Sequence, residues 1–146
     1  MSLIREEAVE RMQRDHQKMI ALIERIRTTC TLGHEVTDGC NICPPGQQQL
    51  CHGNIEQQIR NFIEVTLKHN LMESLYMEQG VPAAHRAAHN RAHVAIAEQL
   101  KSIRVVLAED GNCILAITGI ERVLTTLQDH IASFDEQLEA YLLAPA

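Results

Sequence analysis

Histidine and carboxylate side chains stand at helical spacing in several segments of the 146-residue chain. His69 and Glu73 are four residues apart, and so are His89 and His93, so each pair would point to one face of a helix. Imidazoles and carboxylates are ligands that divalent iron accepts. These residue types at these spacings therefore indicate metal binding. The candidate ligands are His16, His69, Glu73, His89, His93, His130 and Asp135.

The candidate ligands fall on the apolar stripes of four predicted helices. Apolar residues recur every three or four positions over about residues 4–27, 54–79, the segment after Pro82, and 113–143. A single inward histidine is most often a hydrogen-bonded core residue. Seven inward polar residues spread over four helices are different, because burying them without partners is costly. The pattern therefore favours coordination to metal.

Four long amphipathic helices with two short connections predict an all-α, up-down-up-down four-helix bundle. The chain length suits one domain over residues 1–146. The connection between the first two helices is longer, and we interpret residues 28–53 as an insertion. Long connections in compact domains are usually functional or disordered.

The motifs together resemble those of the hemerythrin-like family, particularly bacterial hemerythrins. The family pattern is a histidine in the first helix followed by H-x3-E, H-x3-H and H-x4-D. This chain has His16, then "HNLME", "HNRAH" and "HIASFD" in the same order. The resemblance covers the chain apart from the insertion. Asn70 stands where family members often have Phe, and "LTTLQDHI" lacks the aromatic residue that many have there.

The resemblance implies two iron ions joined by a bridging oxo or hydroxo group. One ion would take His89, His93 and His130. The other would take His16 and His69 and keep one open position, where dioxygen would bind reversibly. Glu73 and Asp135 would bridge the two ions. Candidates to line an apolar pocket at this position are Met12, Met19, Ile20, Leu71, Met72, Ile96 and Leu127.

The third predicted helix offers two H-x3-H pairs, His85 with His89 or His89 with His93. The stripe through His93 continues with apolar residues only, whereas the stripe through His85 places Gln99 inside. We therefore favour His93 as the ligand and keep His85 as the alternative. If His93 is the ligand, His85 lies near the start of the helix, beside a ligand or on the surface.

The H-x4-D spacing of His130 and Asp135 allows two local helix geometries. Five residues turn an ideal helix by about 500°, so the two side chains would diverge by roughly 140°. A π-bulge would bring them closer together, and such bulges concentrate at functional sites. Alternatively, both side chains could reach a central pair of ions from the two flanks of a regular helix, and the spacing leaves both geometries open.

The predicted insertion holds a cluster of cysteines, and two of them form a C-x2-C pair. One interpretation is a small zinc site, because thiolates at such spacing suit tetrahedral zinc. Another is a thiol–disulfide switch, and a third is a loop whose thiols have no special role. The residues concerned are Cys30, Cys40, Cys43 and Cys51.

Composition excludes several classes of function. A net charge of −6 argues against nucleic-acid binding and against electrostatic attachment to anionic lipid. No apolar run is long enough for a membrane span, and the first residues lack the apolar core of a signal peptide. We therefore expect a cytoplasmic protein.

The resemblance favours reversible dioxygen binding, as a carrier or as an oxygen or redox sensor. One alternative is a di-iron enzyme that reduces nitric oxide or peroxide, or that donates iron for repair. Another is a regulatory module that signals through the cysteine insertion to a separate partner. The sequence leaves the oligomeric state open.

Overall fold

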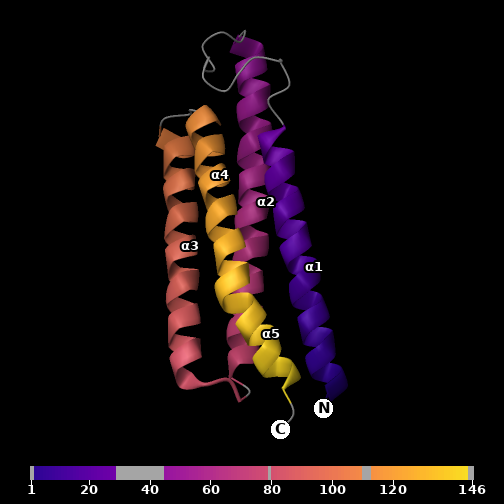
Figure 1. The fold of residues 1–146 in the computed structure, drawn as a ribbon. Helices are drawn as coiled ribbons and strands as arrows, with labels where there is room; N and C mark the ends of the chain where they lie inside the picture. The colour runs from indigo at the N-terminus through magenta and orange to yellow at the C-terminus, as the bar shows by residue number, and fades with distance from the viewer. Residues whose placement is uncertain (1, 29–44, 79, 110–112, 145–146) are drawn as a thin grey trace.

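A computed structural model describes residues 2–28, 45–78, 80–109 and 113–144. Helices α1 (Ser2–Arg27), α2 (Pro45–Met77) and α3 (Ala83–Glu109) alternate in direction (Figure 1). The fourth rod of the bundle is continuous and comprises α4 (Cys113–His130), the π-helix η3 (Ile131–Asp135) and α5 (Glu136–Leu143). The predicted all-α, up-down-up-down four-helix bundle is confirmed.

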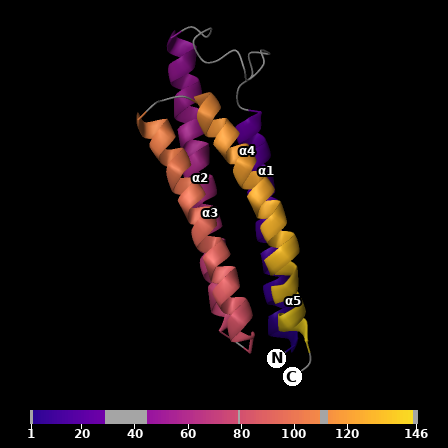
Figure 2. The ribbon, with the colours of Figure 1, turned by 60° about the vertical axis from the view of Figure 1, so that its left-hand side comes forward.

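Each helix packs against its neighbours in the chain, and the first rod closes the bundle against the last. The contacts join α1 with α2, α2 with α3, and α3 with α4, while α1 also contacts α4 and α5 (Figure 2). Within the described residues, no helix has both the length and the apolar character needed to cross a membrane.

Helix α2 begins at Pro45, well before the start near residue 54 that the periodicity predicts. Residues 45–53 are therefore helical and are not part of a loop. Proline is favoured at the first position of a helix, because its missing N–H would be unpaired there in any case. These first turns extend beyond the ends of the other helices (Figures 1 and 2), so no apolar stripe is needed there.

A layer of polar residues divides the core into two apolar clusters. The larger cluster includes Ile23, Phe62 and Ile120. The smaller cluster lies toward the chain termini and includes Met12, Met77 and Leu138. Between them, at the middle of the bundle, lie the buried histidines and carboxylates that the sequence singled out. The two clusters hold the helices on both sides of this layer.

Two helical glycines should respond in opposite ways to alanine substitution. A Cβ added at Gly119 would lie 2.8 Å from Ile103 Cγ1, whereas one at Gly53 meets nothing within 4 Å. Overpacking costs about 1–3 kcal/mol, and alanine gains up to about 1 kcal/mol over glycine in a helix. Urea denaturation should therefore show Gly119→Ala to be less stable than wild type and Gly53→Ala to be more stable. If Gly119→Ala and Gly53→Ala stabilise the protein equally, the close approach of Gly119 to Ile103 is contradicted.

Candidate metal centre

The Glu73 carboxylate is buried at the centre of the polar layer, where α2 faces the other helices. Its Oε2 lies 2.7 Å from His69 Nε2, one turn away on the same helix. Its Oε1 lies 2.9 Å from Nε2 of His93, which α3 contributes. Glu73 thus links histidines from two adjacent helices.

The Asp135 carboxylate joins histidines from three helices. It lies 2.9 Å from Nε2 of His16 on α1 and 2.9 Å from Nε2 of His89 on α3. His130, which ends α4, places its Nε2 3.0 Å from Asp135. In all five histidines around the two carboxylates, Nε2 is therefore the ring atom that points into the cluster.

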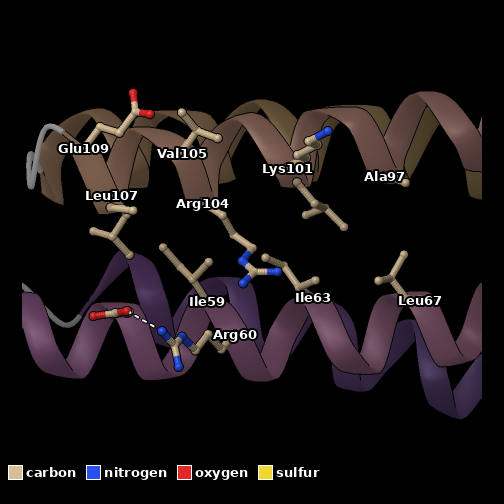
Figure 3. Close-up of a pocket in the computed structure, with 13 residues that line it drawn as sticks. Ile59, Arg60, Ile63, Leu67, Ala97, Lys101, Arg104, Val105, Leu107 and Glu109 are labelled. Carbon is tan, nitrogen blue, oxygen red and sulfur yellow. Dashed lines mark hydrogen bonds and ion pairs between the residues drawn. The ribbon is translucent and has the colours of Figure 1, made fainter.

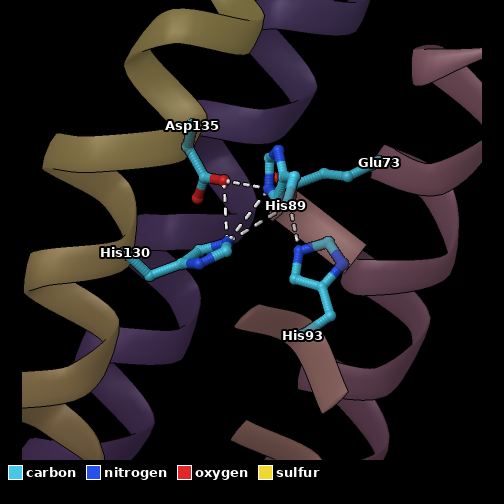
Figure 4. A group of neighbouring side chains, drawn as sticks. All are labelled: Glu73, His89, His93, His130 and Asp135. Carbon is cyan, nitrogen blue, oxygen red and sulfur yellow. Dashed lines mark hydrogen bonds and ion pairs between the residues drawn. The ribbon is translucent and has the colours of Figure 1, made fainter. Parts of the chain in front are cut away.

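The seven side chains form two overlapping groups that share both carboxylates. In the first group, Glu73 and Asp135 meet His89, His93 and His130 (Figure 4). In the second group, the same carboxylates meet the remaining two histidines. Within each group the ligand atoms lie within 4.8 Å of one another. All seven predicted ligands are brought together and buried: His16, His69, Glu73, His89, His93, His130 and Asp135.

Of the two geometries that the spacing allowed, the structure has the π-bulge, which explains how His130 and Asp135 reach the same point. Residues Ile131–Asp135 form a π-helix, and the Glu136 N–H donates to the Ile131 carbonyl five residues earlier. The wider turn brings the two side chains onto one inward face.

The two carboxylates remain ionised despite their burial. Burial raises the pKa of Glu73, but its interactions with His130, His16 and other surrounding histidines outweigh burial and hold the pKa well below the usual value. The pKa of Asp135 is lowered in the same way, because its interactions with His130, His16 and His89 outweigh burial. The cluster therefore presents two negative charges to whatever lies between the rings.

Several atoms in the cluster are buried at short distances from one another without the alignment of a hydrogen bond. Nε2 of His16, Nε2 of His69, Oε2 of Glu73 and Oδ1 of Asp135 take part in the close imidazole–carboxylate contacts described above, but none of these atoms makes a well-aligned hydrogen bond among the described residues. Buried polar atoms in native proteins nearly always have a partner. A cation placed between these atoms would satisfy them together, so the donor set fits a metal ion.

Two side chains contact the outward ring nitrogens of cluster histidines. Asp15 Oδ2 lies 2.9 Å from His69 Nδ1. Nε2 of His85 lies 3.0 Å from His89 Nδ1, and His85 is buried. The surface position that the sequence left open for His85 is therefore wrong, and its imidazole lies beside the candidate ligand His89. The contact of Asp15 with His69 could not be predicted from the sequence, in which the position of Asp15 next to His16 is its one distinguishing feature.

The residues predicted to line an apolar pocket have mixed positions. Met12, Met19, Ile96 and Leu127 are buried in the two apolar clusters. The prediction that Leu71 lines the pocket is wrong, because Leu71 is 62% exposed. Two residues turn a helix by about 200°, so Leu71 lies on the face opposite His69. The other two candidates, Ile20 and Met72, are half-buried.

A groove of about 550 Å³ lies between α2 and α3, apart from the cluster. Ile59 and Ile63 line one side, and Leu107 and Arg104 line the other (Figure 3). None of its lining residues belongs to the histidine cluster. The groove and the cluster are therefore separate features of the surface and the core.

Most of the predicted cysteine cluster lies outside the described residues, namely Cys30, Cys40 and Cys43. Cys51 is on α2, half-buried, and packs against the larger apolar cluster. The zinc and thiol–disulfide interpretations of this segment stay predictions.

Metal uptake should release protons at about pH 7. Burial lowers the pKa of His16 and of His130, but the carboxylates of Asp135 and Glu73 outweigh it and raise both to about 9. Both imidazoles are therefore protonated in the metal-free protein, and ligation requires them neutral. Apparent affinity should rise with pH and level off above about 9. Calorimetry in buffers of different ionisation enthalpy measures the number of protons released. Metal uptake without proton release would contradict the assignment of His16 and His130 as ligands.

Comparison with known proteins gives one match. The family model described as hemerythrin HHE cation binding domain matches residues 7–142. No curated protein and no solved structure shows significant similarity to the chain.

Proposed function

Because the chain belongs to the hemerythrin HHE cation-binding family, we propose that its cluster holds two iron ions and binds dioxygen reversibly, as a carrier or an oxygen sensor. One observation carries the proposal. Five histidine Nε2 atoms and two ionised carboxylates form two overlapping groups, and both carboxylates belong to both groups. Shared carboxylates are what a pair of bridged ions requires, and facing helices of bundles are known places for such pairs.

We assign the ligands by group. His89, His93 and His130 would hold one ion, and His16 and His69 would hold the other. Glu73 and Asp135 would serve both ions, together with an oxo or hydroxo group. The ion with only two histidines would keep an open position. His93 is preferred to His85 because its Nε2 contacts Glu73, whereas Nε2 of His85 contacts the outer nitrogen of His89.

When bound, two iron(II) ions would supply electrons and a coordination position for dioxygen. The protein would supply a site from which bulk water is excluded, because the apolar clusters close the bundle above and below the polar layer. Met19, Ile96 and Leu127 lie in the larger of these clusters and are almost completely buried.

The surroundings of His69 are not wholly apolar, and this favours a sensor over a carrier. Thr66, one turn earlier on α2, and Asn70, the next residue, are both buried. The Thr66 hydroxyl and the Asn70 amide nitrogen have no hydrogen-bond partner among the described residues. Such groups attract water, which would speed irreversible oxidation of the oxygenated protein.

Anaerobic reconstitution with iron(II) tests the metal assignment. We expect two iron ions per chain, and after oxidation a magnetically coupled pair in Mössbauer spectra, because the bridges link the ions. A single uncoupled ferric ion per chain, or no retained iron, would exclude the proposal.

A further inference from the structure

The cluster histidines differ in what supports the ring atom that points away from the cluster. His69 Nδ1 contacts the Asp15 carboxylate, and His89 Nδ1 contacts the imidazole of His85. The corresponding Nδ1 atoms of His93 and His130 are buried without a hydrogen-bond partner among the described residues. The rings of His69 and His89 therefore each have a partner at the nitrogen that faces away from the cluster, and the two rings belong to different groups.

The direction of each hydrogen bond follows from chemistry. A carboxylate only accepts, so His69 Nδ1–H donates to Asp15. For His89, Nε2 must stay free of hydrogen to bind a cation, so Nδ1 carries the hydrogen and donates to His85 Nε2. Each contact fixes both the tautomer and the orientation of its ring, which keeps the Nε2 lone pair directed into the cluster.

The two supports differ in charge. Asp15 on α1 is anionic, with its side chain 29% exposed, so it increases electron density on the His69 ring. His85 lies beside the Phe134 and Tyr141 rings, and the imidazole nitrogen that it offers to His89 carries no negative charge. The His16–His69 group is therefore supported by a negative charge that the other group lacks.

We infer that Asp15 and His85 are positioning residues for different ions. Asp15 strengthens the bond from His69 to its ion, and His85 orients His89 for the other ion. The inference rests on the proposed two-ion site and deepens it, because it assigns one supporting residue to each ion. Loss of such a supporting partner typically lowers metal affinity 10–100-fold.

Titration of the metal-free full-length protein with Co²⁺ tests this assignment. Visible absorption counts the bound ions, and paramagnetically shifted imidazole protons show which histidines bind each ion. Asp15→Asn keeps the shape and removes the charge, so it should weaken the His16–His69 ion about tenfold. Asp15→Ala should weaken it further. His85→Phe should weaken only the ion held by His89.

Asp129→Asn is the matched control. Asp129 also directly precedes a cluster histidine, but it is exposed on α4. This variant should bind both ions with the affinity of wild type. Helical circular dichroism of each metal-free variant checks that the bundle has formed.

The outcomes distinguish an error in the two-ion site from an error in the roles of Asp15 and His85. If wild type does not take up two Co²⁺ ions, the two-ion site itself is wrong. If wild type takes up two, the inference is overturned by wild-type affinity in Asp15→Asn, or by weakening of the same ion in Asp15→Asn and His85→Phe. Equal weakening of both ions by either variant would also overturn it, because that result indicates a general role in folding.

Discussion

Glu73→Gln should abolish binding of both metal ions. Glu73 carboxylate oxygens lie within 3.9 Å of Nε2 in all five cluster histidines, from 2.7 Å at His69 to 3.9 Å at His130. Glutamine keeps the size of the side chain but removes the charge and one oxygen ligand. Because both groups share this carboxylate, one substitution should affect both ions. Metal analysis after anaerobic loading should fall from two ions per chain to none.

Glu64→Gln is the control for this experiment. Glu64 is also on α2, but it is exposed and pairs only with Lys68, at 2.9 Å. The control should keep both ions. The metal-free form of Glu73→Gln should also be less stable, because breaking a buried charge pair by removing one partner costs about 3–5 kcal/mol. Retention of two ions by Glu73→Gln would show that this carboxylate does not bridge.

His93→Ala and His85→Ala should separate the two histidine pairs of α3. Both remove a buried imidazole from the same helix, with 7% and 8% of the residue exposed. His93→Ala removes a ligand atom and should leave one ion per chain. His85→Ala removes a support and should leave two ions at saturating metal, with lower affinity.

Metal content measured after desalting distinguishes these results. Loss of an ion in His85→Ala, with both ions kept in His93→Ala, would show that the ligand pair is His85 and His89. Equal loss in both variants would show that the bundle requires both rings for its packing, and it would contradict the assigned difference in role.

The sequence predicts most of the helices because their inward stripes are apolar and periodic. It does not predict the first turns of α2, because the apolar residues show no helical periodicity there. Leu50 in this segment is 67% exposed, and the turns extend beyond the other helices. A single half-buried residue such as Cys51 is not enough to make a periodic apolar stripe in the sequence. Pro45 at the first helical position was the only signal of its true start.

The candidate ligands could be predicted from the sequence because ligand pairs on one helix have fixed spacing. The five-residue separation of His130 and Asp135 also indicated the π-helix at Ile131–Asp135 as one of two possible geometries, although spacing alone did not decide between them. Contacts between helices are different, since their register is set by packing. The contact of Asp15 with His69 and the burial of His85 depend on that register, and spacing along one helix cannot predict them.

The most direct test of the account is the absorption spectrum of the anaerobically reduced, iron-loaded protein during repeated exposure to oxygen and vacuum. We predict a visible charge-transfer band that appears with oxygen and disappears when oxygen is removed, over at least one cycle before oxidation accumulates. Slow loss of the band over later cycles fits a sensor, and its persistence fits a carrier. Immediate oxidation of both ions, with no band that reverses, would contradict reversible dioxygen binding.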